Sequence, residues 1–411
     1  MPAIPAPGNA VVAQSGGPTA VINQSLVGVV EGLRTHGRGS IGSIFGARHG
    51  VRGMVDEIFV DLTSTPPDLL DAVAATPSAA LGSSRDKPDA AYCERILAAL
   101  KKKSIRYFFY IGGNDSSDTC RIVSEMAEST KYELKAIHVP KTIDNDLMMN
   151  DHTPGYASAA RYVAKAFMGD NLDNASLPGI KINVVMGRHA GFMTAAAALG
   201  KQREDDGPHL VYLPEVPFDL DRVSAEVEAV YKKLKRCLIA VSEGVQDRDG
   251  TPLLAKLSPA GSEKDAHGNV RLSGTGALGD ALAAELSKRL TPAGGKSPRT
   301  RADTLGYPQR CYPDASPIDQ HEARLVARFA ARAACEGATN GSIAIQRIAG
   351  PGSARPDQPY AVEFKRVELK EVAAKTRHMP AEFIAGTSGV TPAFCEWLKP
   401  LVGEMPRVGR L

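Results

Sequence analysis

The sequence predicts an α/β fold of two doubly wound domains, each built on a mainly parallel sheet. Three observations lead to this class. Short apolar strands alternate with amphipathic helices, glycine pairs follow two of the strands, and a second strand–helix series begins after residue 150. Such alternation gives parallel strands, because each helix returns the chain to the same end of the sheet before the next strand starts.

The first series runs from residue 9 to residue 140. Its strands are β-branched or aromatic runs, and its helices carry apolar residues three or four positions apart. One predicted helix begins with a proline and ends in a basic turn, and another has Ser and Asp in its first turn. The predicted strands are 9–14, 39–47, 105–111 and 134–140, and the predicted helices are 20–37, 88–104 and 116–129.

The second series repeats the alternation. Its predicted elements are helix 155–168, strand 181–186, helix 190–200, strand 209–213, helix 219–235 and strand 237–242. Residues 247–299 are rich in Gly, Pro and charge, so we interpret them as surface insertions around one helix at 276–290.

Composition limits the class of partner. The chain has 411 residues, enough for two or three packed layers or two domains, and its 43% apolar and 23% charged residues are ordinary for a globular protein. The 49 basic residues nearly balance the 46 acidic ones, which argues against nucleic acid or a membrane surface as the main partner. A small polyanion bound in a local basic pocket stays open. No run of about 18 apolar residues occurs, so we expect no membrane-spanning helix.

The cysteines, histidines and N-terminal stretch favour a cytoplasmic protein without zinc. None of the six cysteines forms a C-x-x-C pair, so we interpret them as reduced core thiols. The nine histidines contain no H-x-x-x-H pair. The opening MPAIPAPGNA lacks the basic and apolar regions of a signal peptide.

Two glycine pairs stand where predicted strands turn into helices: Gly16-Gly17 and Gly112-Gly113. Ligands of open parallel sheets bind outside the carboxyl ends of the strands. Glycine lets backbone N–H groups approach phosphate oxygens, and the helix N-terminus that follows adds partial positive charge. Either pair alone could simply make a tight turn, but two pairs on neighbouring strands favour an anion site.

The segment PKTIDND (140–146) is more specific. Asp144 and Asp146 follow a strand end, with Lys141 and Thr142 just upstream. A carboxylate near a phosphate is repelled by it, so its presence indicates a function such as binding a metal or taking a proton from an attacking hydroxyl. The alternative is an Asx-turn rich in Asp and Asn.

Three further segments bring polar side chains to strand ends. In MGRHAGF (186–192), Arg188 is placed for fork binding of a phosphate, whereas a lone His189 is more often structural. SEGVQ (242–246) places Glu243 at a strand end. RADTLGYPQR (301–310) is interpreted as a short strand with Arg301 and Arg310 at its ends.

Together these segments resemble the phosphofructokinase family. The ordered set is SGG (15–17), LGSSR (81–85), GGNDS (112–116), PKTIDND (140–146), MGRHAG (186–191), SEG (242–244) and LGYPQR (305–310). The resemblance implies phosphoryl transfer to the 1-hydroxyl of fructose 6-phosphate with Mg²⁺ as cofactor. The donor is ATP in one branch of the family and pyrophosphate in the other.

The resemblance also implies roles for single residues. Asp144 matches the general base, with Lys141, Asp115 and Arg188 as the other catalytic residues. The donor-binding residues would be Gly16, Arg85, Gly113, Asp115 and Lys141. The sugar-phosphate-binding residues would be Thr142, Ile143, Asp144, Met186, Gly187, Arg188, Glu243, Arg301, Tyr307, Pro308, Gln309 and Arg310. The Mg²⁺ ligands would be Asn114 and Asp146.

The family's domain organisation follows from the same resemblance. Residues 1–149 with about 313–370 would bind the donor, and residues 150–312 with about 371–411 would bind the sugar phosphate, with the insertion at about 247–299. The active site would lie in the cleft between the two domains. Family members assemble into oligomers whose substrate sites are completed across an interface, so we expect a homodimer or homotetramer.

Two positions argue for pyrophosphate as the donor. The ATP branch has glycine where this chain has Asp115 and again where it has Lys141. The Asp115 side chain would occupy the space of an α-phosphate and repel it, and Lys141 would add positive charge where a short donor ends.

The sequence departs from the family at several places. Asn114 stands where an Asp linked to Mg²⁺ is usual, and Tyr307 stands where the ATP branch has His. Ser25 and Val29 fall where allosteric bacterial ATP enzymes carry effector-binding arginines, which predicts that this regulation is absent. Lys181 is a weak match to an arginine that completes a neighbour's site.

Three alternative functions remain beside the pyrophosphate enzyme: an ATP-dependent phosphofructokinase, a non-catalytic regulatory subunit of the same fold, and a lipid or NAD kinase with a similar glycine loop. The retained Asp144, Asp146 and Arg188 argue against the silent subunit. The lipid or NAD kinase leaves PKTIDND and MGRHAG unexplained. Whether sedoheptulose 7-phosphate is also a substrate is not decided by the sequence.

Overall fold

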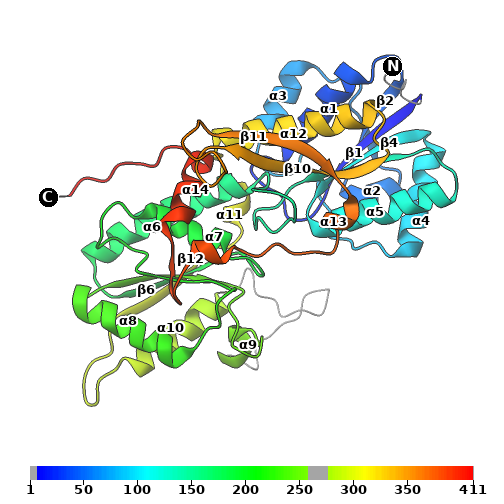
Figure 1. Ribbon diagram of the computed structural model, residues 1–411. Helices are drawn as coiled ribbons and strands as arrows, with labels where there is room; N and C mark the ends of the chain where they lie inside the picture. Colours follow the sequence, from blue (N-terminus) through cyan, green and yellow to red (C-terminus); the bar gives the residue numbers. More distant parts are fainter. Residues whose placement is uncertain (1–6, 258–275, 411) are drawn as a thin grey trace. The chain divides into compact units, whose positions relative to one another are not determined.

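The structure is a computed structural model that describes residues 7–257 and 276–410 (Figure 1). The described chain forms two compact units. Of the described residues, the first contains 7–143, 147–158 and 310–377, and the second contains 144–146, 159–257, 276–309 and 378–410. Both units are built on mainly parallel sheets, which confirms the predicted fold class. The central part of the expected insertion, 258–275, lies outside the described residues.

The first unit contains a seven-stranded sheet in the order β11-β10-β5-β4-β1-β2-β3. Its strands are β1 (Gly8–Gln14), β2 (Ile41–Ala47), β3 (Phe59–Asp61), β4 (Ile105–Gly112), β5 (Lys135–Pro140), β10 (Asn340–Ala349) and β11 (Ala361–Val367). The five central strands run parallel, and the two edge strands, β3 and β11, are antiparallel to their neighbours. Strands β1, β4 and β5 are therefore adjacent, and their carboxyl ends share one edge of the sheet.

Helices cover both faces of this sheet. They are α1 (Ile22–His36), α2 (Gly50–Val55), α3 (Pro67–Ala75), α4 (Ala90–Lys102), α5 (Asn114–Ser129), α12 (Pro317–Cys335) and α13 (Leu369–Val372). Side chains of α1, α3 and α12 form one apolar core with the sheet, and those of α2, α4 and α5 form the other. Figure 1 shows α1 and α12 together on one side and α4 and α5 on the other.

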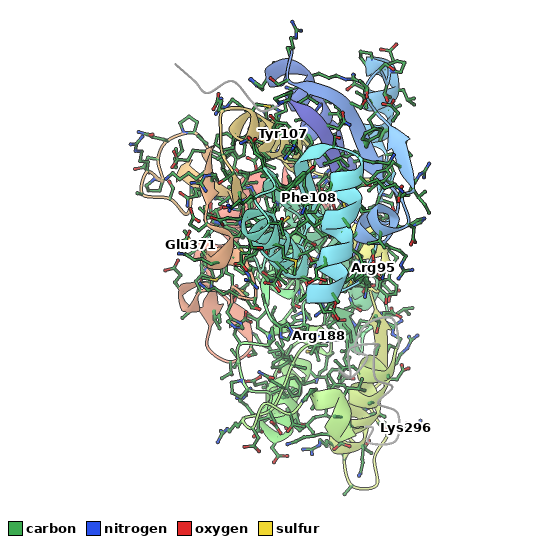
Figure 2. All side chains as sticks on the ribbon, turned by 90° about the vertical axis from the view of Figure 1, so that its right-hand side faces the viewer. Arg95, Tyr107, Phe108, Arg188, Lys296 and Glu371 are labelled. Atoms are coloured by element: carbon green, nitrogen blue, oxygen red, sulfur yellow. The ribbon has the colours of Figure 1, made fainter. Side chains whose placement is uncertain are left out.

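The central strand β4 shows why both faces need a cover. Tyr107 belongs to the core under α1 and α12, and the next residue, Phe108, belongs to the core under α4 and α5 (Figure 2). Consecutive strand residues point to opposite faces, and both of these side chains are fully buried. A continuous apolar strand of this kind is typical of a parallel sheet between two helix layers.

The second unit has a four-stranded parallel sheet in the order β7-β8-β6-β9. Its strands are β6 (Ile180–Val185), β7 (Leu210–Tyr212), β8 (Cys237–Ser242) and β9 (Thr300–Thr304), with a small β12–β13 ribbon (Ile384–Ala385, Gly389–Val390). The helices are α6 (Tyr156–Ser176), α7 (Phe192–Ala195), α8 (Leu220–Leu234), α9 (Leu253–Leu257), α10 (Ala277–Arg289), α11 (Pro308–Cys311) and α14 (Pro392–Val402). Residues of α8 and α10 share an apolar core with the sheet.

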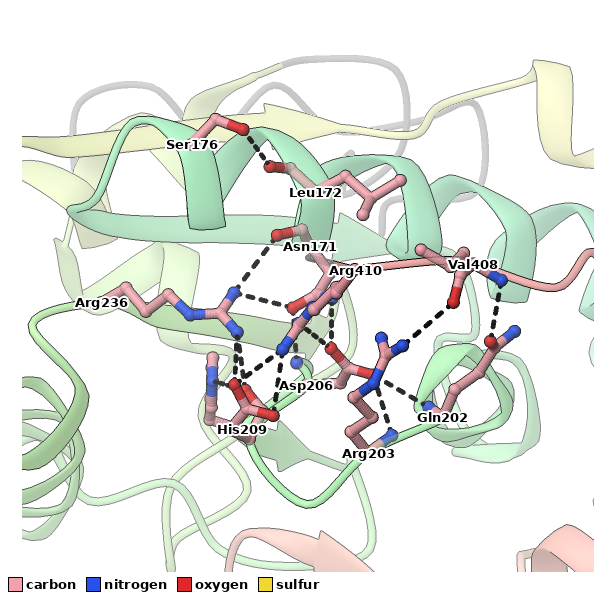
Figure 3. Close-up of polar contacts among 12 residues, drawn as sticks. Asn171, Leu172, Ser176, Gln202, Arg203, Asp206, His209, Arg236, Val408 and Arg410 are labelled. Carbon is pink, nitrogen blue, oxygen red and sulfur yellow. Dashed lines mark hydrogen bonds and ion pairs between the residues drawn. The ribbon is translucent and has the colours of Figure 1, made fainter.

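Polar contacts fasten the C-terminal segment to the second unit (Figure 3). The Arg410 guanidinium pairs with Asp205 at 2.9 Å and also with Asp206. The Asp206 carboxylate accepts from Asn171 Nδ2, and Arg236 donates to Asn171 Oδ1 at 2.9 Å. These opposed charges, one of them buried at Asp206, fix the last described residues against the end of α6 and the loop before β7.

Most predicted elements occur within a few residues of their expected bounds, but several differ. Helix α6 continues to Ser176, well beyond residue 168, and the helix expected at 190–200 is a short α7 followed by a 3₁₀ turn, Ala196–Gly200. The strand expected at 301–310 ends at Thr304, because Gly306 has a φ of +57° and turns the chain into α11. Elements α2, β3 and α3 were not predicted, because their apolar runs are too short to show a period.

Among the helices of the described residues, none combines the length and the apolar character that a membrane crossing requires.

Candidate active site

Two groups of predicted residues meet at strand ends, one in each unit. The first, which we call the glycine edge, consists of Ser15–Gly17, Gly112–Asp115 and Lys141 at the carboxyl ends of β1, β4 and β5. The second, which we call the arginine edge, consists of Met186–Arg188 and Glu243 at the carboxyl ends of β6 and β8. Within each unit, the parallel strands bring the residues of its group to one edge of the sheet.

Gly16 makes the first turn of the glycine edge. Its φ of +73° lies in the left-handed region, where a side chain would be strained. The Gly16 N–H donates to Ser84 O at 2.8 Å, and the Ser83 hydroxyl donates to Gly16 O at 2.6 Å. The segment LGSSR therefore packs directly on this turn and places Arg85, an exposed residue, beside it.

Lys141 supplies the positive charge of the glycine edge. Its residue is only 3% exposed, and its Nζ donates to Gly17 O at 2.7 Å. A Cβ added at Gly16 would lie 3.1 Å from that nitrogen. Glycine at position 16 thus allows a buried ammonium to approach the turn closely, and an ammonium there can neutralise a phosphoryl oxygen.

The second turn is made by Gly112 and Gly113. A Cβ at Gly112 would lie 2.0 Å from Ser116 Oγ and 2.2 Å from Ser15 Oγ, so no larger residue fits without movement. Those two hydroxyls are hydrogen-bonded to each other, and Ser15 Oγ also donates to Ile111 O at 3.1 Å. The two glycine turns are therefore locked together side by side.

A buried neutral histidine supports the second turn from behind. His138 Nε2 lies 2.8 Å from Gly112 O, and its Nδ1 lies 2.8 Å from Ser342 Oγ. Burial lowers the pKa of His138 to about 4, so the ring is neutral. Because a carbonyl only accepts, Nε2 carries the proton and Nδ1 accepts from the serine hydroxyl.

Asn114 and Asp115 open helix α5 instead of preceding it. The helix was predicted to start at residue 116, but it begins at Asn114, with Gly113 as its N-cap residue. The Asp115 carboxylate, with 62% of its side chain exposed, pairs with Lys87 at 3.2 Å. An anion in the first turn of a helix is favoured by the partial charge that would also attract a phosphate.

The PKTIDND segment leaves the glycine edge and is pinned where it departs. Lys141 N donates to Gly112 O at 2.9 Å, and Thr142 N donates to Pro154 O at 3.2 Å. The Thr153 hydroxyl donates to Thr142 O at 2.9 Å. Residues 143–152, which include Ile143, Asp144 and Asp146, therefore form a loop closed at its base by hydrogen bonds.

At the arginine edge, close backbone approach joins β6 to β8. The φ of Gly187 is +127°, and the Ser242 hydroxyl donates to Gly187 O at 2.6 Å. A Cβ at Gly244 would lie 1.9 Å from Arg188 O, so only glycine at position 244 allows the two backbone segments to come this close. Glu243 is buried, with 6% exposed, and its N–H donates to Val185 O.

Arg188 lines a polar pocket of about 310 Å³ in the second unit. Figure 2 labels Arg188 in this unit. The other lining residues are His189, Pro214, Glu215, Gln246 and His378. His378 Nδ1 lies 2.8 Å from His189 O, and Glu215 accepts from the backbone of Gly191 and Met379 at 2.9 Å. Burial and the neighbouring Arg188 lower the pKa of His189. A pocket with arginine and neutral histidine suits a phosphorylated polar ligand.

Residues of the LGYPQR segment (305–310) contact both edges. Gln309 Oε1 accepts from Met186 N at 3.2 Å, so Gln309 joins the arginine edge, and Pro308 begins α11 next to it. Arg310 instead lies beside Gly17, where a Cβ at Gly17 would be 2.9 Å from Arg310 Nε. Tyr307 is 46% exposed.

Arg301 is not brought to the arginine edge. It stands near the start of β9, opposite Lys181 in the register with β6, and pairs with Asp173 at 3.0 Å. Since β6, β8 and β9 are parallel, Arg301 lies at the amino end of the sheet, whereas Met186 and Glu243 lie at the carboxyl end. The prediction of a strand with arginines at both ends was wrong at its second end, because β9 stops at Thr304 and Arg310 lies in α11.

The oxygen donors among the predicted residues suit Mg²⁺ better than a transition metal. Asn114, Asp115 and Asp146 offer amide and carboxylate oxygens. In residues 7–257 and 276–410 no three His, Cys, Asp or Glu side chains gather into a group that could hold a metal by itself. Mg²⁺ usually keeps water and substrate phosphates as ligands beside one or two protein oxygens, so this donor set fits it.

Comparisons with known proteins decide the family. A model described as phosphofructokinase matches residues 9–334. The chain belongs to the phosphofructokinase family. Within this family it is 54% identical over 407 residues to a pyrophosphate–fructose 6-phosphate 1-phosphotransferase of Rhodospirillum rubrum, covering 98% of this chain and 96% of the relative. A protein of the same name from Halomonas elongata is 38% identical, with 98% and 96% covered.

A solved phosphofructokinase structure has the same fold over nearly the whole chain. The crystal structure of a pyrophosphate-dependent phosphofructokinase from Nitrosospira multiformis superposes with a TM-score of 0.83 at 33% identity, covering 98% of this chain and 94% of that one. The family resemblance and the pyrophosphate branch predicted from the ordered motifs are thereby confirmed.

Sequence reasoning missed several residues that shape these edges. The serine pair Ser15 and Ser116, the supporting His138, and His378 in the arginine pocket were not singled out. The segment DHTPG (151–155) was also passed over, although a histidine flanked by Asp and Thr shortly after PKTIDND was a usable signal. The partners of His138 and His152 come from strands and helices far along the chain, which no local pattern reveals.

Proposed function

We propose that this phosphofructokinase transfers a phosphoryl group reversibly from pyrophosphate to the 1-hydroxyl of fructose 6-phosphate, giving fructose 1,6-bisphosphate and phosphate. The observation that carries the proposal is the glycine edge, where a buried Lys141 reaches the Gly16–Gly17 turn and Asp115 occupies the N-terminal turn of α5. The names of the relatives that match along almost the full chain support the same donor and acceptor.

The donor would bind at the glycine edge. The N-terminal turn of α5, which follows the N-cap residue Gly113, adds partial positive charge at this edge, and Lys141 neutralises the charge of one phosphoryl group. Arg85 and Arg310 flank the same turn and add positive charge to the transferring group. A nucleotide would place its α-phosphate against the carboxylate of Asp115, at a cost on the order of several kcal/mol for like charges in one site.

The sugar phosphate would bind at the arginine edge. Glu243, buried at the end of β8, can accept from sugar hydroxyls, and Arg188 can hold a phosphate oxygen pair. Met186, Gly187 and the segment Tyr307–Arg310 would complete the contacts, with Gln309 fixing the Met186 backbone. Arg301, at the opposite end of its strand, would act in the neighbouring subunit of a homodimer or homotetramer.

In the reaction, Asp144 would take the proton of the 1-hydroxyl as that oxygen attacks the terminal phosphorus of pyrophosphate. The bond from phosphorus to the bridging oxygen breaks, and phosphate leaves. Thr142 and Ile143 position the sugar, while Lys141 and Arg188 neutralise charge on the transferred group. Mg²⁺, held by Asn114 and Asp146 with Asp115 nearby, would offset the negative charge of the donor oxygens. We place the reaction in the cytoplasm, as a step of glycolysis and gluconeogenesis.

A donor assay tests the proposal. The purified protein is given Mg²⁺ and fructose 6-phosphate with either pyrophosphate or ATP, and formation of fructose 1,6-bisphosphate is followed. We expect turnover with pyrophosphate, about 100-fold or more above that with ATP, and loss of turnover on chelation. Turnover with ATP alone would identify the other branch, and none with either donor would identify a silent subunit. The same assay with sedoheptulose 7-phosphate in place of fructose 6-phosphate shows whether a seven-carbon sugar phosphate is also an acceptor.

A further inference from the structure

A buried histidine, six residues after the end of the PKTIDND segment, lies between two carboxylates. His152 is 1% exposed, its Nδ1 lies 2.7 Å from Asp151 Oδ2, and its Nε2 lies 2.5 Å from Glu322 Oε2. A carboxylate oxygen only accepts hydrogen bonds, so each ring nitrogen must carry a proton to make both contacts. With both carboxylates ionised, the geometry favours an imidazolium cation, in contrast to the neutral ring of His138.

Three elements surround this cation with matched charges. Arg347 on β10 pairs with Asp151 at 3.1 Å, and Arg377 donates to Asp151 O at 2.7 Å. The hydroxyl of Tyr360, just before β11, donates to Glu322 Oε1 at 2.7 Å. Together with the buried Asp319 on α12, the ionisable groups around His152 are three carboxylates, two arginines and one phenol. Compensation of this kind makes a buried charge tolerable.

The His152 cation lies in the turn at residues 151–155, and this turn closes the loop that carries Asp144. Asp319, one helical turn before Glu322, accepts from Gly155 N and Ser158 N at 2.9 Å. Asp151 N donates to Ile345 O at 2.8 Å, which ties the same turn to β10. When this turn is in position, the Thr153 hydroxyl donates to Thr142 O, and Pro154 O accepts from Thr142 N. Thr142 lies two residues before Asp144. Helix α12 thus reaches the PKTIDND loop through His152 and Asp319.

We propose that the imidazolium of His152, bridging Asp151 and Glu322, is a positioning group that keeps the base of the loop 142–155 closed and thereby holds Asp144 for proton transfer. The role rests on the proposed function, because it assigns the proton-accepting task to Asp144. His152 touches neither substrate in this account. It acts through Thr153 and Thr142.

The protonation of His152 makes the bridge sensitive to alkaline pH. Burial alone would lower its pKa, but the charge of Glu322 and the hydrogen bonds to both carboxylates outweigh burial and raise the pKa to about 9. A folded-state pKa above the unfolded value means that the stabilisation is complete below about pH 6.5 and is lost as pH rises through about 9. We therefore expect the loop to loosen, and turnover to fall, near that pH.

Glu322→Gln isolates the role of the proton. The amide keeps the length of the side chain, and it can donate to a neutral imidazole, so the bridge no longer needs a second ring proton. The matched control is Arg324→Gln on the same helix, whose side chain instead pairs with Glu31 on α1 and with Asp71. kcat and KM with pyrophosphate and fructose 6-phosphate are measured from about pH 6 to about pH 10 for the wild type and both variants.

We expect the wild type and Arg324→Gln to lose kcat with an apparent pKa near 9, with both KM values nearly constant, and Glu322→Gln to lose this alkaline fall. His152→Ala should lower kcat about tenfold or more at every pH, because the carboxylates of Asp151 and the buried Glu322 then lose the cation between them. An alkaline fall that is identical in Glu322→Gln and the wild type, or no fall in the wild type, would overturn the proposal.

Amide hydrogen exchange separates this inference from the proposed function. In the wild type we expect residues 142–155 to lose protection between about pH 7.5 and about pH 9.5 after correction for the intrinsic rate, and Glu322→Gln to keep it. This measurement stands even if the protein transfers no phosphoryl group from pyrophosphate, which would refute the function alone. Unchanged wild-type protection at about pH 9.5 would overturn the bridge, even if the variants failed to fold.

Discussion

The glycine edge and the arginine edge stand at the same position of two parallel sheets but are built from different chemistry. The glycine edge presents backbone turns at Gly16 and Gly112, with Lys141 as its buried charge. The arginine edge presents side chains, Arg188 and Glu243, around a polar pocket. Backbone N–H groups suit small phosphates that must approach closely, whereas side chains of both signs suit a ligand with hydroxyls and a phosphate. From this difference we expect each edge to bind its own substrate.

The largest effect should come from the loop that carries the proton acceptor. Asp144→Asn keeps the shape of the side chain but removes its basicity, so we expect kcat to fall by about 10²- to 10⁴-fold with both KM values little changed. Steady-state kinetics measure the effect. The control Asp118→Asn removes a partly exposed carboxylate that pairs with Arg121 on α5 and should leave kcat nearly unchanged. Near-normal turnover of Asp144→Asn would show that another group accepts the proton.

A substitution at Gly112 should break the glycine edge alone. In Gly112→Ala the added methyl group would meet Ser116 Oγ and Ser15 Oγ and push the two turns apart, at a cost of about 1–3 kcal/mol. We expect KM for pyrophosphate to rise by about tenfold or more while KM for fructose 6-phosphate is unchanged. The control Gly169→Ala on α6 has open space around it and should be silent. An equal rise in both KM values would contradict separate edges.

The reciprocal change at the arginine edge should be smaller. Glu243→Gln keeps the side-chain volume but weakens hydrogen bonds to sugar hydroxyls, so KM for fructose 6-phosphate should rise about tenfold, equivalent to about 1.4 kcal/mol. KM for pyrophosphate should stay constant. Glu285→Gln, which removes a surface pair with Arg289 on α10, serves as the control. If only KM for pyrophosphate rose, the arginine edge would bind the donor, and the assignment of substrates to the two edges would be reversed.

How much the sequence could predict differs between the parts of these edges. The glycine pairs, PKTIDND and MGRHAG predicted which strand ends carry the candidate site residues, because parallel topology brings the carboxyl ends of neighbouring strands to one sheet edge. Asp115 was placed in a loop before α5, since nothing local shows that Gly113 serves as the helix N-cap. Arg301 was assigned to the sugar phosphate from its motif, and only the register with β6 shows that it lies at the other end of the strand.

The two buried histidines mark the limit of sequence reasoning. His138 and His152 are both buried next to functional turns, yet burial lowers the pKa of one to about 4 and carboxylates raise the pKa of the other to about 9. The deciding partners, Ser342 for His138 and Glu322 for His152, lie far along the chain. The sequence contains both partners of each pair, but it does not show that His138 contacts Ser342 or that His152 contacts Glu322.

The central claim is that Asp115 and Lys141 select the two-phosphate donor at the glycine edge. The most direct measurement compares kcat/KM for pyrophosphate and for ATP in the wild type and in the double variant Asp115→Gly/Lys141→Gly, which places at both positions the glycine that the family resemblance implies for the ATP branch. We expect the ratio of the two values to fall by about 100-fold or more, with KM for fructose 6-phosphate preserved, because the repelling carboxylate and the short-donor cation are both gone. An unchanged ratio in a folded, active double variant would contradict the account.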